Sequence, residues 1–246
     1  MPRNLGWSIL LIALVAFSSD ADAAQAAHFV PTASNLLPSG PDMLGTRAVP
    51  ITAERFADYL KRAREDASSS PLLQRLIVPA RQLPPLQKIA FVQRAVTANI
   101  RWISDATQWG QHSYWASALQ TLSKGAGDTE DRAIVKMQAL RALGFNNSDL
   151  FLTLARDRVG GPMTVLTVRT GGRYYIVDDT GGPPYQAEER RFEFEPIMSF
   201  GMYGAWVHAG PSTIVYGSGK TTVASAVTES SAVASAKTDS AALARK

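Results

Sequence analysis

The sequence predicts an α+β fold in which helices come first and an antiparallel sheet follows. In the first part of the chain, apolar residues recur every three or four positions, which is the period of an amphipathic helix. Beyond Gly144 they recur at every second position, which is the period of a strand. A run of helices followed by a run of strands is typical of α+β proteins, whereas alternation would indicate a parallel sheet.

The first residues predict a secretory signal peptide, residues 1–23. Arg3 precedes an apolar run at residues 5–17, which is short for a membrane span and is followed by small residues of the Ala-x-Ala type. Cleavage is expected after Ala23, with Ala24 as the alternative. We therefore expect a mature protein that is periplasmic or secreted and keeps no stable membrane anchor after signal cleavage.

The composition is that of a soluble globular protein with one core, with 46% hydrophobic and 19% charged residues. The chain has no cysteine, so the core must hold the fold without disulfides even in an oxidising compartment. Loss of the signal peptide removes one base and two acids and raises the formal net charge from +4 to +5. Because bases and acids interleave along the chain, we expect no binding to nucleic acid.

The helical part of the chain follows an extended lead-in, residues 24–50, which is rich in Pro, Gly, Ser and Ala. The folded domain is expected to cover residues 51–216. Its predicted helices begin near Thr52, at 85–99 behind a pair of prolines, at 115–122 after a loop at 104–113, and at 131–143. Gly144 ends the last of these helices, which is the central one.

Three strands are predicted beyond the central helix, at residues 150–154, 163–168 and 174–177. Gly171 and Gly172 indicate a hairpin turn between the second and the third. Residues 183–216 carry many aromatic residues but no clear period. Residues 217–246 contain no aromatic residue and are dominated by Ala, Ser, Thr and Val, which predicts a disordered tail.

The stretch Gly-Asp-Thr-Glu-Asp at residues 127–131 opens the central helix. The first turn of a helix exposes unpaired N–H groups and the positive end of the helix dipole. A cysteine at this place would have a lowered pKa, and a histidine on a neighbouring strand with an orienting carboxylate would complete a catalytic triad. The middle residue of the stretch is Thr129, so the sequence has the layout of such an enzyme without its thiol.

The chain resembles the bacterial transglutaminase-like cysteine peptidases over about residues 85–180. The resemblance rests on Tyr114-Trp115-Ala116, residues 127–134, Lys136 and the Leu-Arg-Ala-Leu-Gly run at 140–144. The family has Gly-Asp-Cys-Glu-Asp at the helix start, His-x-Val-Leu on a strand, and Leu-Asp-Asn at the end of another. It includes the periplasmic protease that releases biofilm adhesins. The resemblance implies a papain-like or transglutaminase-like fold, with N-terminal helices followed by an antiparallel sheet.

Carried over from the family, the nucleophile position falls on Thr129, the base position on Met163 and the orienting acid on Asp178. Methionine cannot accept a proton, and a threonine hydroxyl needs a base before it can attack. The histidines at 28, 112 and 208 lie outside the family position, and for His112 and His208 we expect surface or packing roles.

The resemblance therefore predicts an inactive pseudo-peptidase that acts by binding a peptide segment or a regulatory partner, either a surface adhesin or an envelope regulator. One alternative is an active hydrolase with a non-standard nucleophile or base. The other is a structural envelope protein whose tail serves as a tether.

Two further expectations concern residues around the nucleophile position. In the family, acids beside the nucleophile are implicated in calcium binding, and Asp128 and Glu130 match two of them. Alternatively, Asp128 caps the helix and Glu130 complements its dipole. We expect Trp102 and Trp115 in the core, whereas nearby aromatic residues at 109 and 114 fit either packing or a peptide groove.

Overall fold

A computed structural model of the protein describes residues 39–157, 161–190 and 193–210. The predicted signal peptide and the predicted tail lie outside these residues, as does most of the lead-in. All the described residues belong to one compact unit of the chain. Among them, no helix has the length and apolar composition that crossing a lipid bilayer requires.

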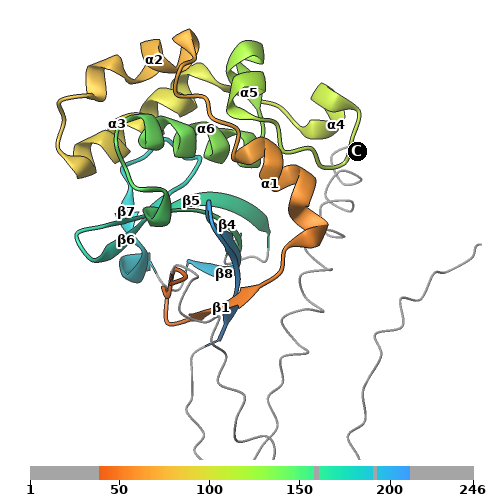
Figure 1. Ribbon diagram of the computed structural model, residues 1–246, viewed down its shortest axis with the longest axis vertical. Helices are drawn as coiled ribbons and strands as arrows, with labels where there is room; N and C mark the ends of the chain where they lie inside the picture. Colours follow the sequence, from red (N-terminus) through yellow and green to blue (C-terminus); the bar gives the residue numbers. More distant parts are fainter. Residues whose placement is uncertain (1–38, 158–160, 191–192, 211–246) are drawn as a thin grey trace, which may run out of the picture. The chain divides into compact units, whose positions relative to one another are not determined.

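The helices gather on one side of a strongly curved sheet (Figure 1). In the described part of the chain the α-helices are α1 (Ala57–Ala63), α2 (Pro71–Ile77), α3 (Pro85–Asn99), α4 (Asp105–Trp109), α5 (Ala118–Lys124) and α6 (Thr129–Ala142). Short 3-10 turns accompany them at Glu54–Phe56, Val78–Ala80, Asn147–Asp149 and Ala187–Arg190. Helix α3 occupies the predicted range 85–99, with Pro85 at its first turn.

The main sheet is antiparallel throughout and has the order β1-β9-β8-β4-β5-β6-β7 within the described residues. Its strands are β1 (Arg47–Ile51), β4 (Leu150–Asp157), β5 (Pro162–Thr170), β6 (Arg173–Val177), β7 (Tyr185–Gln186), β8 (Phe194–Phe200) and β9 (Ala205–Ala209). The predicted hairpin between β5 and β6 is confirmed, since Gly171 and Gly172 both have positive φ, as a tight two-residue turn requires.

A second, small pair of strands lies beside the helices. Strand β2 (Arg101–Trp102) runs parallel to β3 (Ala126–Gly127), and Trp102 is the Cα partner of Gly127. This pairing brings the end of α3 next to the start of α6. It therefore positions two exposed side chains, Arg101 and Trp102, beside the first turn of the central helix.

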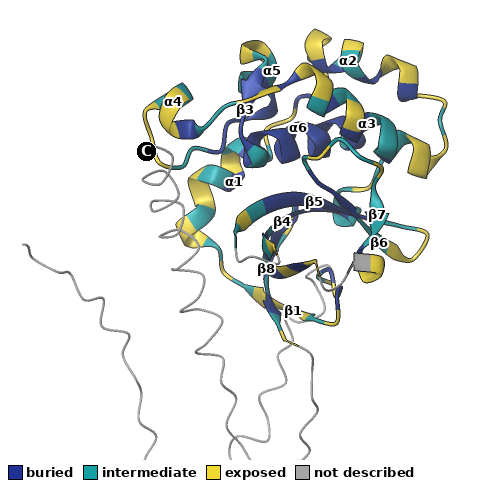
Figure 2. Ribbon diagram, turned by 180° about the vertical axis from the view of Figure 1, so that it is seen from behind, coloured by how far each residue is buried: buried dark blue, intermediate teal, exposed yellow. Residues whose placement is uncertain are grey.

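Helix α6 is the centre of the molecule. Figure 2 shows it dark around its circumference, and every residue from Glu130 to Leu140 is buried. Asp128 begins the helix as its N-cap, and Gly144, with φ of +92°, follows its end. The sequence predicted one apolar face on this helix, but the helix has no solvent face because α3, α5, β4 and β5 all pack around it.

The core has two parts, one on each face of the sheet. The helix-side cluster contains residues of α1, α3 and α6 together with Leu166 and Val168 of β5. The far-side cluster contains Val165 of the same strand, with Met43, Leu44, Ala155, Ile176, Ala187 and Phe194. Successive side chains of a strand point to opposite faces, so this division fixes the direction of every residue of β5.

Several elements differ from the sequence predictions. Helix α2 was not predicted, and the five-residue α4 falls in the expected loop at 104–113, because both helices are too short to show a helical period. Leu86 is an apolar residue of the predicted helix at 85–99, but it is 47% exposed. The last residues of the lead-in form β1, an edge strand that pairs with β9 and contains Pro50. Residues 183–210 supply β7, β8 and β9.

Candidate functional site

Thr129, which the resemblance assigns to the nucleophile position of the family, is the first residue of α6. The carboxylate of Asp128 accepts hydrogen bonds from the backbone N–H groups of Glu130 (3.2 Å) and Asp131 (3.4 Å), so Asp128 is a helix N-cap. Thr129 follows and is half-buried. Its hydroxyl donates a 2.7 Å hydrogen bond to Oε2 of Glu130. The capping role that the sequence allowed for Asp128 is therefore confirmed.

Met163, which the resemblance assigns to the base position of the family, lies on β5. Met163 packs against the far-side cluster and pairs with Ala155, a member of that cluster. Thr164 is the residue that shares a face with Leu166 and Val168, and its partner Leu154 packs against the helix-side cluster. Met163 therefore points away from the helical layer that carries Thr129, and the neighbouring position that faces this layer holds a threonine.

Asp178, which the resemblance assigns to the orienting acid of the family, follows the end of β6 and is buried. Its Oδ1 accepts hydrogen bonds from Nε2 of Gln93 (2.9 Å), from the backbone N–H of Thr180 (3.0 Å) and from the Thr180 hydroxyl (2.7 Å). A carboxylate oxygen with three donors of this kind is well satisfied. Asp178 is thus held by the protein's own amide and hydroxyl groups, in the place where the family has it orient a histidine.

A buried cation fixes the loop that carries Asp178. Nζ of Lys136, on α6, donates to the backbone oxygen of Asp178 (2.5 Å) and to Oδ1 of Asp179 (2.7 Å). Arg132 forms a second ion pair with Asp179 at 3.2 Å. Burial lowers the pKa of Lys136, and the neighbouring charge of Asp179 opposes that shift. The retained family lysine therefore ties the helix to the end of β6.

Neither histidine in the described residues stands in for the missing base. His208, on β9, is buried, with Nε2 2.8 Å from Oγ of Ser199 and Nδ1 2.8 Å from Oγ1 of Thr46. Burial lowers its pKa to about 4. His112 is exposed in the loop after α4. His28 lies outside the described residues.

A buried group of carboxylates is the clearest polar feature near the start of α6. One oxygen from each of Asp105, Asp128 and Asp131 lies within 4.8 Å of the others, and all three side chains are buried. Asp105 begins α4, so the group joins two helices that are distant in sequence. Glu130, which the resemblance paired with Asp128 as a calcium ligand, is outside this group and instead accepts from Thr129.

Asp131 is the most unusual member of the group. It is 0% exposed, its Oδ1 accepts from the backbone N–H of Ala116 at 2.7 Å, and its Oδ2 has no hydrogen-bond partner within the described structure. Burial raises the pKa of Asp131 to about 7, and the charges of Asp105 and Glu130 act in the same direction. A cation between the three carboxylates would satisfy the free oxygen and offset their repulsion.

Gly127 makes room for this arrangement. A Cβ at position 127 would lie 2.6 Å from Cβ of Asp131 and 2.7 Å from its Oδ2. Only glycine therefore allows the buried carboxylate to occupy its place. The sequence prediction missed Asp105 and Asp131 as potential ligands, because Asp105 is 23 positions before Asp128 and only the fold brings the two together.

Of the two tryptophans that were expected in the core, one is buried and the other is exposed. Trp115 is 3% exposed and packs against the rings of Phe56, Tyr59 and Phe200, so its core prediction is confirmed. Trp102 is 55% exposed, so its core prediction is wrong. Strand β2 is only two residues long and both of its side chains are exposed, which leaves the indole of Trp102 open to solvent beside β3.

The sequence profile of the bacterial transglutaminase-like cysteine proteinases matches residues 48–211. Three solved structures of Legionella pneumophila LapG are similar in fold. The calcium-bound form is 22% identical, with a TM-score of 0.48, over 61% of this chain and 80% of that chain. The EGTA-treated form is 21% identical, with a TM-score of 0.49, over 68% and 95%. The third is 23% identical, with a TM-score of 0.49, over 65% and 88%.

A comparison with curated proteins returns no match. The matched region of the family profile runs from β1 through β9 and so includes every described element that forms the helical layer and the sheet. It covers about two thirds of the chain and contains the positions of Thr129, Met163 and Asp178. This chain belongs to the bacterial transglutaminase-like cysteine proteinase family.

Proposed function

We propose that this protein is an exported, catalytically inactive member of its family that binds a peptide segment or a regulatory partner without cleaving it. The observation that carries the proposal is the state of the two reacting positions. Thr129 occupies the nucleophile position and donates a hydrogen bond to Glu130, and Met163 at the base position packs against an apolar cluster. A pair of this kind cannot form the thiolate–imidazolium pair on which cysteine peptidases rely.

The face beside Thr129 supports a binding role. Arg101 and Trp102 are exposed on β2, and Trp102 is paired with Gly127, two residues before Thr129. Exposed tryptophan and arginine side chains are the types most enriched at the energetic centres of protein interfaces. The partner that binds this face would be a surface adhesin or a regulator of the cell envelope. The protein would meet this partner after export directed by residues 1–23.

We further propose that Asp105, Asp128 and Asp131 hold a calcium ion. Three buried carboxylates supply hard oxygen ligands, and calcium accepts the irregular geometry that side chains from two helices offer. Bound calcium would neutralise the group and tie the start of α6 to α4. The calcium-bound LapG indicates which ion to test first.

The experiment that tests the binding proposal uses the mature protein beside its Thr129→Ala variant. Both are incubated with an adhesin-type substrate and with a mixed peptide library, with and without calcium, and cleavage and binding are measured together. We expect binding and no cleavage, equally for both proteins. Cleavage that disappears in Thr129→Ala would overturn the proposal.

A second candidate function rests on the same 2.7 Å hydrogen bond. The carboxylate of Glu130 is placed to accept the proton of the Thr129 hydroxyl, so the pair has the geometry of a nucleophile and a general base. Glu130→Gln keeps the size of the side chain but removes its basicity. A hydrolase of this kind would lose activity in both Thr129→Ala and Glu130→Gln, and its rate would rise as the carboxylate deprotonates.

A further inference from the structure

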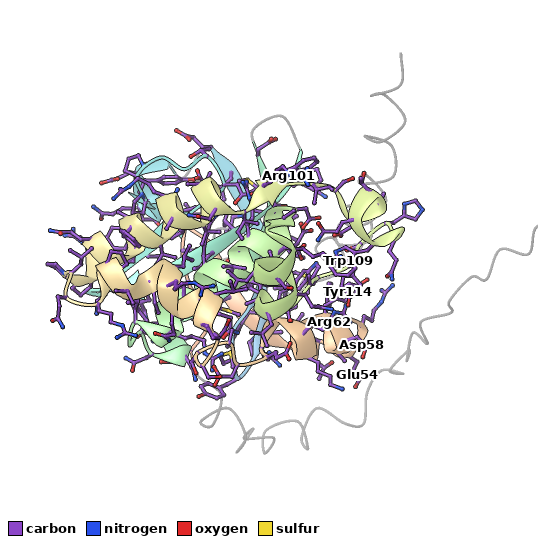
Figure 3. The ribbon with its side chains drawn as sticks, turned by 90° about the horizontal axis from the view of Figure 1, so that it is seen from above. Glu54, Asp58, Arg62, Arg101, Trp109 and Tyr114 are labelled. Atoms are coloured by element: carbon purple, nitrogen blue, oxygen red, sulfur yellow. The ribbon has the colours of Figure 1, made fainter. Side chains whose placement is uncertain are left out.

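A stack of planar side chains crosses the surface beside the carboxylate group. The ring of Trp109 lies on the ring of Tyr114, with centroids 4.6 Å apart and planes 37° apart. The guanidinium carbon of Arg62 lies 4.3 Å from the centroid of Tyr114, and Nζ of Lys124 lies 4.9 Å from that of Trp109. Figure 3 shows Arg62, Tyr114 and Trp109 in this order across the molecule.

The stack is anchored to the helical layer through Arg62 and through Tyr114. Nε of Arg62, on α1, donates a 2.7 Å hydrogen bond to the backbone oxygen of Trp115. The hydroxyl of Tyr114 accepts from Nε2 of Gln120, on α5, at 3.1 Å. The indole Nε1 of Trp109 is buried with no hydrogen-bond partner in the described structure, so ring contacts are what hold this side chain.

The same residues close the segment that begins with Asp105. Trp109 is the last residue of α4, the helix that Asp105 begins. Tyr114 returns to that beginning, because its backbone N–H donates a 2.7 Å hydrogen bond to Oδ2 of Asp105. The segment from 105 to 114 is therefore a closed loop whose ends are joined by this hydrogen bond, and the Trp109–Tyr114 contact packs the middle of the loop against its last residue.

This closure has a consequence for the carboxylate group. Asp128 and Asp131 belong to one helix start, whereas Asp105 comes from the loop and is drawn into a region that is already negative. Without a cation, repulsion favours a loop that swings Asp105 away from the other two. Cation–aromatic and ring–ring contacts at the base of the loop oppose that movement.

We propose that Arg62, acting through Tyr114 and Trp109, is a positioning residue that holds Asp105 ready for the cation. The inference rests on the proposed calcium site and deepens it. Arg62 donates its hydrogen bond to the backbone of Trp115 and lies over the ring of Tyr114, so the stack links it to Asp105 through the backbone N–H of Tyr114. Its removal should weaken calcium binding by about tenfold or more, as the loss of groups that orient metal ligands usually does.

The test titrates calcium into the mature protein by isothermal calorimetry, and terbium as a luminescent substitute. The variants are Arg62→Ala, Arg62→Lys and Tyr114→Phe, with Arg55→Ala as the matched control. Arg55 is an exposed arginine of the 3-10 turn before α1. Asp131→Asn is titrated alongside to show that the measured binding belongs to this site.

We expect a calcium dissociation constant raised about tenfold in Arg62→Ala and less in Arg62→Lys, which keeps the charge and loses the planar stack. Arg55→Ala should bind as the unaltered protein does, whereas Tyr114→Phe, which keeps the ring but loses the hydrogen bond from Gln120, should bind more weakly than the unaltered protein and more tightly than Arg62→Ala. The melting temperature without calcium separates this effect from general loss of stability. If Arg62→Ala fails to fold, Arg62→Lys carries the test.

Two results would overturn the inference, and they are distinguishable. If the unaltered protein binds calcium and both Arg62 variants bind it equally well, the calcium site stands and the positioning role is wrong. If neither the unaltered protein nor Asp131→Asn binds calcium or terbium, the proposed calcium site itself fails, and the positioning role fails with it.

Discussion

The hydroxyl of Thr129 donates a 2.7 Å hydrogen bond to the carboxylate of the adjacent Glu130. In an active family member the corresponding atom is a thiol that gives its proton to an imidazole. A glutamate carboxylate is a weaker base than an imidazole, so this hydrogen bond favours a stable polar contact over activation of the hydroxyl for attack.

Thr129→Cys alone should create a reactive thiol but no peptidase. The helix start will lower the pKa of the new thiol, so it should react quickly with iodoacetamide. Substrate cleavage should stay at the level of the unaltered protein, because β5 offers Met163 and Thr164 and no imidazole. Labelling rate and cleavage are measured on the same preparation, and cleavage by the single variant would contradict the prediction.

Two double variants test which face of β5 points toward Thr129. Thr129→Cys with Thr164→His places an imidazole on the face of β5 that carries Leu166, whereas Thr129→Cys with Met163→His places it toward the far-side cluster. We expect the first pair to gain cleavage activity and the second to remain inactive. The reverse order would show that residue 163 reaches the helix start.

Asp131→Asn should abolish the stabilisation that calcium gives. The substitution removes one ligand charge from the group, and it also removes a buried oxygen that has no partner, so the calcium-free protein should melt at the same temperature or higher. Calcium at ~100 times its dissociation constant stabilises the unaltered protein by about 2.7 kcal/mol. Melting curves with calcium and with chelator measure both effects, with Asp58→Asn at an exposed position of α1 as the control.

Gly127→Ala should destabilise the protein and weaken calcium binding together. The new Cβ would lie within 2.7 Å of Oδ2 of Asp131, so the carboxylate must move out of its buried place. Overpacking of this kind typically costs about 1–3 kcal/mol. Urea denaturation and calcium titration measure the two effects. Gly210→Ala is the matched control, since a Cβ there meets no atom within 4 Å.

Stability should fall on acidification because of His208. Its folded pKa of about 4 lies below the ordinary value of about 6.5, so between these pH values the unfolded chain binds more protons. The stability is complete above pH ~6.5 and is lost as the pH falls toward ~4, by up to ~3 kcal/mol. Urea denaturation at several pH values measures the slope. His208→Gln should flatten it, whereas a change at the exposed His112 should not.

Trp102→Ala should weaken partner binding while leaving stability almost unchanged. The indole is 55% exposed and lies beside the start of α6, so its loss removes contact area from the proposed binding face and little from the core. Tyr203→Ala is the control, because Tyr203 is 58% exposed and contacts Asn147, which follows the opposite end of α6. Equal binding by the Trp102 variant would place the partner elsewhere.

The sequence predicted the fold class and the central elements well, because in a long segment the period of the apolar residues indicates which positions are buried. Helix α3 and the Gly171–Gly172 hairpin come from local chemistry that is readable along the chain. The order of the sheet could not be read in this way, since β1 and β9 are about 160 residues apart and each is only five residues long. Their pairing is a property of the whole fold.

The candidate site could be predicted only in part, because it too depends on residues that are distant along the chain. The family pattern located Thr129 and Asp178, but a pattern gives no direction to a side chain, so the outward face of Met163 came only from the packing of β5. The carboxylate group needed Asp105 and Asp131 beside Asp128, and that meeting depends on the path of the loop from α4 to Trp115. Both the direction of Met163 and the carboxylate group therefore depend on the folded arrangement of the chain, which a sequence pattern does not show.

Helix α6 is completely buried from Glu130 to Leu140, so the residues that maintain the fold are distinct from the half-buried residue at the start of the helix. The amide protons of this helix should be the last in the domain to exchange with deuterium, because they open only when the whole domain unfolds. Thr129 stands one residue outside that protected run. Selection can therefore alter or discard the reactive atom there without disturbing the scaffold, and a lineage can lose its enzyme while it keeps its form.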